Sequence, residues 1–166
     1  AQQNDSIVVM GPLGRPQIQR FLAGRSIRHF IEEVEQPLLY VPIAMVPVKR
    51  VIISVGGLGY DVNAEHLASQ IALKSGAEVV LLHIVPPIDL NYPTAQTVNR
   101  NWQHLTETDT PVGRSLRQSL ENMKAIGVNA VVKVRQGNIV EEILEECHQG
   151  TDLLCMGSSY SVHSLR

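Results

Sequence analysis

Three glycines near the start of the chain have a spacing that could hold a phosphate group. Gly11, Gly14 and Gly24 form a G-x2-G-x9-G pattern directly after the apolar run SIVVM. Backbone N–H groups of such a loop, with the start of a following helix, favour anions. Glycines also serve ordinary turns, so a phosphate loop and a plain turn both remain open.

A second glycine-rich loop, VGGLGYDV at 55–62, is a partial match to a dinucleotide-binding fingerprint. Val62 stands where the third glycine should be, and the next apolar run ends in His83-Ile84-Val85 rather than in an acidic residue. The sequence contains no G-x4-G-K-[ST] motif. A nicotinamide, flavin or P-loop site is therefore not expected.

Other reactive side chains do not form a recognisable catalytic or metal-binding set. The six histidines lack metal-ligand spacing, and the serines near the end have no visible base or orienting acid. The carboxylates of one predicted helix are expected to form a solvated face: Glu141, Glu142, Glu145 and Glu146. We expect no catalytic residue and no metal site.

Composition limits the possible partners. The 166 residues carry a net charge of −2 and are 44% hydrophobic, without a basic patch for nucleic acid or an apolar run long enough to cross a bilayer. The two cysteines, Cys147 and Cys155, are read as small buried side chains in a reducing compartment. We therefore expect a cytoplasmic protein that binds neither nucleic acid nor membrane.

Apolar runs and helical patterns alternate along the chain. Strands are expected at 6–10, 37–41, 48–55, 78–85, 129–134 and 152–156. Helices are expected at 18–34, 64–76, 116–126 and 138–148, the last with Ile139, Val140, Ile143 and Leu144 inward. Residues 88–111 are polar and read as loop or as the frayed start of a helix. Continuously apolar strands between helices predict a doubly wound α/β fold with a parallel sheet.

The two ends of the chain are alike: DSIVVMGPLGR begins at Asp5, TDLLCMGSSYSVHSLR begins at Thr151, and Met156 follows Met10 by 146 residues. With EVVLLHIVPP and NAVVKVRQGNIVEEILEE, these stretches resemble the universal stress protein family. The resemblance implies a five-stranded parallel sheet of order 3-2-1-4-5. It divides the chain into the C-terminal part of one domain, residues 1–47, and the N-terminal part of a second, residues 48–166.

The resemblance also implies an ATP site, with Mg, between the first-strand and fourth-strand loops. Arg25 occupies the usual Ser/Thr position, Gly56 the place of the first-strand aspartate that meets the nucleoside, and Tyr160 that of the second glycine in the later loop. These departures indicate a degenerate site. The residues it assigns to nucleotide binding are Met10, Gly11, Gly14, Arg15, Gly24, Arg25, Ser26, Val55 and Ile84.

We therefore expect a non-catalytic stress-response module with a degenerate adenine-nucleotide site. Two alternatives remain: an ATP-binding switch with at most slow hydrolysis, and a purely structural dimerisation or regulatory domain. Because neither part holds all five strands, we expect an intertwined homodimer in which segment exchange between chains completes the sheet. A non-exchanged dimer and a permuted monomer are the alternatives to it.

Overall fold

The computed structural model describes residues 6–11, 34, 36–43, 47–57, 61–87 and 93–157. The chain divides into two compact units, Ala1–Val46 and Pro47–Arg166. In the first unit, β1 (Val8–Met10) and β2 (Leu38–Tyr40) form a two-stranded parallel sheet, with Met10 opposite Tyr40. The helix predicted at 18–34 falls almost wholly outside the described residues.

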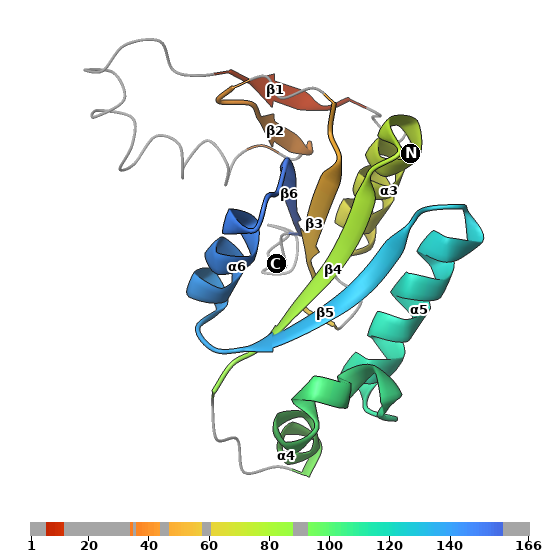
Figure 1. Cartoon of the computed structure of the whole chain (residues 1–166), viewed down its shortest axis with the longest axis vertical. Coiled ribbons are helices and arrows are strands. Elements are labelled where there is room, and N and C mark those ends of the chain that lie inside the picture. The colour runs from red at the N-terminus through yellow and green to blue at the C-terminus, as the bar shows by residue number, and fades with distance from the viewer. Residues whose placement is uncertain are drawn as a thin grey trace, which may run out of the picture. The chain divides into compact units, whose positions relative to one another are not determined.

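The second unit contains a four-stranded parallel sheet (Figure 1). Its strands are β3 (Arg50–Ser54), β4 (Glu78–Val85), β5 (Ala130–Gln136) and β6 (Leu153–Met156), in the order β5-β4-β3-β6. All three strand pairs are parallel. The predicted α/β class is confirmed, and these strands follow the first four positions of the predicted 3-2-1-4-5 order.

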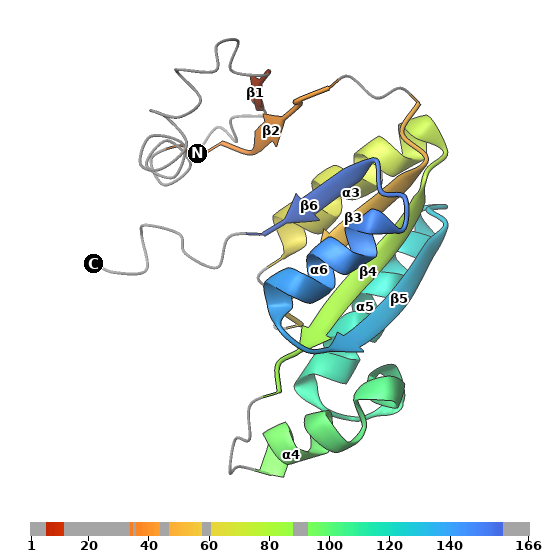
Figure 2. The ribbon, with the colours of Figure 1, turned by 60° about the vertical axis from the view of Figure 1, so that its left-hand side comes forward.

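Helices cover both faces of this sheet (Figure 2). α3 (Val62–Ser75) and α5 (Pro111–Ala125) lie on one face, and α6 (Ile139–His148) lies on the other. Each face has its own apolar core, and β4 is buried over almost its whole length because it contributes side chains to both. This two-sided burial explains why β4 reads as a continuous apolar run. None of the helices in the described ranges has the length and apolar character needed to cross a membrane.

Most of the described part of 88–111 is helical, so the loop interpretation is wrong there and the helical alternative is nearer to the structure. This part contains α4 (Pro93–Arg100) and a 3-10 helix (Trp102–Glu107). Ala95 and Leu105 are buried there, and tertiary packing of these side chains stabilises the short helical turns. Thr110 then caps α5 by accepting a hydrogen bond from the Gly113 N–H at 3.1 Å.

The predicted inward face of α6 is also largely wrong. Ile143 is buried, but Ile139, Val140 and Leu144 are 49%, 64% and 52% exposed. Glu146, expected on a solvated acidic face, is fully buried. The helix is therefore rotated so that a carboxylate points toward the sheet while three of the four aliphatic side chains remain largely exposed.

Candidate functional site

The carboxyl ends of β3 and β6 lie side by side where the order of strand addition reverses. From β3 the chain proceeds through α3 to β4 on one side, whereas β6 lies on the other side of β3. In open α/β sheets, ligands bind in the crevice outside the strands at such a switch point. The residues that follow β3, β4 and β6 are therefore the candidates for a ligand site.

After β3 the chain turns sharply at two glycines. The Val55 N–H donates to the Leu82 carbonyl at 2.9 Å, which continues the pairing with β4. Gly57 has φ +75°, and a Cβ added there would lie 2.6 Å from Cγ1 of Val112. This position requires glycine because of both its left-handed backbone and the close approach of α5.

The side chain of Asp61 lies between the ends of β3 and β6. Asp61 directly precedes α3, yet its side chain does not cap that helix. Its Oδ2 instead accepts the Gly56 N–H at 2.7 Å. A Cβ added at Gly157, just after β6, would lie 2.6 Å from Asp61 Oδ1. The carboxylate is therefore held between the two strand ends, and the residue is only 8% exposed.

His83, near the end of β4, is buried next to the turn that follows β3. Its Nδ1 lies 2.9 Å from the Val55 carbonyl oxygen, so Nδ1 carries the proton and donates it. Burial lowers the pKa of His83, while the Val55 carbonyl and the charge of Asp61 act in the opposite direction. The ring is thereby favoured in its neutral form and supports the β3 turn.

The structure describes four of the nine predicted nucleotide-binding residues. Val55 and Ile84 are 5% and 7% exposed, but they belong to the cores on opposite faces of the sheet. Met10 ends β1 in the first unit, and Gly11 follows it with open space where a Cβ would sit. The remaining ones lie outside the described residues: Gly14, Arg15, Gly24, Arg25 and Ser26.

Asp61 was not among the residues predicted from the sequence to form the site. The only signal was its place immediately before the apolar periodicity of α3, which is typical of a helix cap. In the fold, Asp61 lies beside the end of β3, where its carboxylate accepts the N–H of Gly56, the residue expected at the position of a strand-end aspartate. An aspartate is therefore present at this strand end, supplied from five residues further along the chain.

Comparison with solved structures finds other proteins with a similar fold. A universal stress protein from Archaeoglobus fulgidus DSM 4304 aligns with a TM-score of 0.62 at 20% identity, covering 96% of this chain and 53% of that chain. The universal stress protein UspA from Lactobacillus plantarum aligns at 0.54 and 17% identity, covering 74% and 85%. A universal stress protein in complex with cAMP aligns at 0.47 and 21%, covering 65% and 75%.

At these identities the likeness concerns the fold, and this chain spans about half of the Archaeoglobus protein. Among curated protein sequences, the comparison found no match. The family model for the universal stress protein family matches residues 47–161, which is most of the chain. This protein belongs to the universal stress protein family.

Proposed function

We propose that this protein is a non-catalytic stress-response module whose adenine-nucleotide site is degenerate. The observation that supports this proposal is the position of Asp61, whose carboxylate lies between the ends of β3 and β6. A phosphate bound there would need backbone N–H donors and a positive local field. Asp61 already takes the N–H of Gly56 and adds a negative charge beside Gly157.

The size of this effect can be estimated from Coulomb's law. Two unit charges 4 Å apart repel by about 4 kcal/mol at an effective dielectric constant of about 20, a typical value near a protein surface. A phosphate oxygen at the first glycine of the later loop would lie about that close to Asp61. A penalty of this size corresponds to roughly a thousandfold loss in affinity.

The proposal extends to the organisation of the chain. Residues 1–47 would be the C-terminal part of one family domain, and residues 48–166 the N-terminal part of a second. The sheet would then be completed to five strands by segment exchange in an intertwined homodimer. We place the module in the cytoplasm, where its two free cysteines, Cys147 and Cys155, would stay reduced.

A second candidate function, an ATP-binding switch with Mg and at most slow hydrolysis, is favoured by the same residue. Asp61 stands at the end of β3, where the family's aspartate meets the nucleoside end of ATP. Its carboxylate could accept a ribose hydroxyl in that role. The predicted loop from Gly11 to Ser26 would then hold the phosphates.

The isosteric change Asp61→Asn separates the two functions. We would titrate the protein with ATP and magnesium and record native mass spectra, using Glu141→Gln on the exposed face of α6 as the control. A degenerate site predicts that the unmodified protein stays empty at millimolar ATP and that Asp61→Asn gains affinity. A switch predicts that the unmodified protein binds and that both Asp61→Asn and Gly14→Glu bind less.

If neither the unmodified protein nor Asp61→Asn binds ATP, the third alternative gains support. The glycines would then be turn residues of a purely structural pairing or regulatory domain. Nucleotide bound by the unmodified protein at micromolar ATP would refute the degenerate site outright.

A further inference from the structure

The peptide group between Val55 and Gly56, just after β3, is held on both sides by side chains from other parts of the fold. Its carbonyl oxygen accepts a hydrogen bond from Nδ1 of His83 on β4, at 2.9 Å. Its N–H donates to Oδ2 of Asp61, the residue before α3, at 2.7 Å. Because the C=O and N–H of a trans peptide point in opposite directions, the two side chains lie on opposite sides of this group. Its orientation therefore depends on both of them.

The same two side chains decide whether the peptide group could take the reverse orientation. A neutral imidazole has one N–H and one acceptor nitrogen, and the position of its proton follows its hydrogen-bond partner. With its proton on Nε2, His83 would accept the Gly56 N–H at Nδ1. The reversed carbonyl would then face Asp61, and an ionised carboxylate only accepts hydrogen bonds. The negative charge of Asp61 is therefore what holds the orientation seen here.

Glycine at position 56 is not required by the present backbone. Gly56 is not among the described glycines with positive φ, and a Cβ added there would meet Asp61 Oδ2 at an ordinary contact distance of 3.6 Å. Gly57 differs, since it has φ +75° and an added Cβ would lie 2.6 Å from Val112. Reversal of the peptide group would carry φ of residue 56 to positive values, which glycine adopts readily. Reversal therefore gives a reason for glycine at position 56.

The other groups around this peptide do not replace the charge of Asp61. Glu65, one turn along α3, interacts electrostatically with Asp61, but its carboxylate accepts a hydrogen bond from Ser119 of α5 at 2.8 Å. Val112 of α5 and Gly157 after β6 approach the turn with uncharged atoms. Apart from the imidazole on β4, Asp61 is thus the titratable group that contacts the peptide within the described residues.

We propose that the peptide group between Val55 and Gly56 is a two-position switch of the candidate site, set by the charge of Asp61. While Asp61 is ionised, the N–H points to Asp61 and the carbonyl points to His83. When that charge is neutralised, or when hydroxyl or ammonium groups of a ligand bind the carboxylate, the peptide group reverses and His83 accepts its N–H. This inference rests on the place that the proposed function gives to Asp61, and it adds how a change there reaches β4.

The tautomer of His83 reports the position of the switch. In isotope-labelled protein, the nitrogen chemical shifts distinguish a protonated from an unprotonated ring nitrogen, and His83→Gln assigns this ring among the six histidines. We expect only the Nδ1–H form in the unmodified protein at neutral pH. In Asp61→Asn, whose amide can donate to a carbonyl, the Nε2–H form should rise to at least about a tenth of the molecules, which places the two orientations within about 1.4 kcal/mol.

Gly56→Ala provides the matched control, because alanine fits the present orientation but disfavours the reversed one. Alone, this change should leave the midpoint of urea unfolding unchanged or slightly raised. Combined with Asp61→Asn, it should return His83 to the Nδ1–H form. Glu141→Gln removes an exposed carboxylate of α6 and should give the same tautomer as the unmodified protein.

The switch is overturned if His83 keeps only the Nδ1–H form in Asp61→Asn. It is also overturned if the Nε2–H form persists when Gly56→Ala is added, because the tautomer would then change without reversal. Asp61→Ala serves if Asp61→Asn does not fold. It leaves the Gly56 N–H without its acceptor, so the Nε2–H form should appear there too, and its absence would refute the switch.

These results are distinguishable from those of the nucleotide titration, because the tautomer is measured without nucleotide. ATP bound by the unmodified protein at micromolar concentration would refute the degenerate site and leave the tautomer of Asp61→Asn as support for the switch. A His83 ring that stays in one tautomer would instead remove the switch, and an empty site at millimolar ATP would still support the proposed function.

Discussion

Neutralising Glu146 should destabilise the protein more than any other change to a carboxylate of α6. The substitution Glu146→Gln keeps the shape of the side chain but removes a charge that contacts Arg50, Lys133 and Arg135. Glu146 is fully buried, so its three partners would lose their common counter-ion. Glu78, at 4.0 Å from Arg50, and Glu142 compensate only part of that charge.

The loss in free energy of unfolding lies between two known limits. Breaking a fully buried ion pair costs about 3–5 kcal/mol, whereas exposed pairs contribute about 0–1 kcal/mol. Glu146 is buried, but the side chains of Arg50, Lys133 and Arg135 are 21%, 39% and 23% exposed, so water can solvate them in part. We expect Glu146→Gln to lower the free energy of unfolding by about 2–3 kcal/mol.

At acid pH the difference in free energy of unfolding between the unmodified protein and Glu146→Gln should become smaller. Burial tends to raise the pKa of Glu146, but hydrogen bonds from Lys133 and Arg50 outweigh it, and the net pKa is lowered. A carboxylate with a lowered pKa in the folded state stabilises the fold above its unfolded pKa of about 4.3. That contribution is lost as pH falls through the folded pKa, so the two proteins should converge there.

Urea unfolding at pH 7 and pH 3 measures both effects. The control is Glu145→Gln, the exposed neighbour on the same helix, which should change the free energy of unfolding by less than about 0.5 kcal/mol. The reasoning is refuted if Glu146→Gln is no less stable than Glu145→Gln at pH 7. A difference that persists undiminished in acid would show that packing, rather than charge, is responsible.

Three further changes test the loops and caps around the sheet. Gly57→Ala should lower the free energy of unfolding by about 2–4 kcal/mol, because it adds a collision with Val112 to a left-handed backbone. Gly76→Ala, also left-handed but in open space, should lower it by only about 1–2 kcal/mol in the same urea assay. The pKa of His83 is lowered in the folded state, so between that pKa and about 6.5 the unfolded state binds more protons and the free energy of unfolding rises with pH. His83→Gln should make this rise smaller. Asn138→Ala should lower the melting temperature by removing about 1 kcal/mol of helix capping at the Val140 and Glu141 N–H groups.

The strands and their parallel arrangement could be predicted from sequence because they depend on local patterns. β4 reads as a continuous apolar run since both its faces are covered, and turns such as Gly76 mark helix ends. The orientation of α6 could not be predicted in this way. It depends on Glu146 meeting Arg50, which lies 96 residues away in sequence. Asp61 escaped prediction for a similar reason, because its contact with Gly157 joins residues far apart in sequence.

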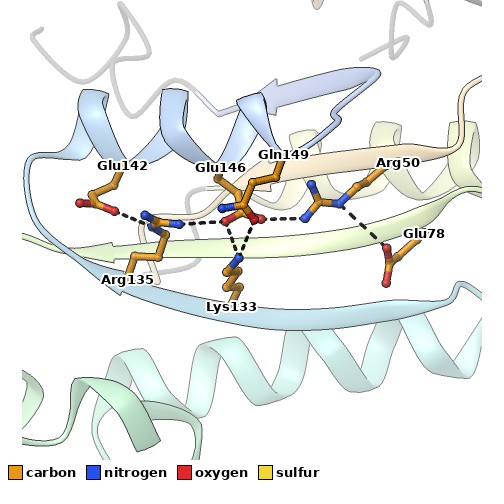
Figure 3. Close-up of polar contacts among 7 residues, drawn as sticks. All are labelled: Arg50, Glu78, Lys133, Arg135, Glu142, Glu146 and Gln149. Carbon is orange, nitrogen blue, oxygen red and sulfur yellow. Dashed lines mark hydrogen bonds and ion pairs between the residues drawn. The ribbon is translucent and has the colours of Figure 1, made fainter.

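The orientation of α6 links its charges to its apolar surface. Hydrophobic burial alone would turn Val140 and Leu144 toward the sheet, gaining about 1.5–3 kcal/mol for each side chain. That rotation would pull Glu146 away from Lys133 and Arg135 and leave cations on the sheet face without a carboxylate. The ion pairs of Glu146 with Arg50, Lys133 and Arg135 (Figure 3) therefore hold Val140 and Leu144 outward, at the expense of the hydrophobic free energy that their full burial would contribute.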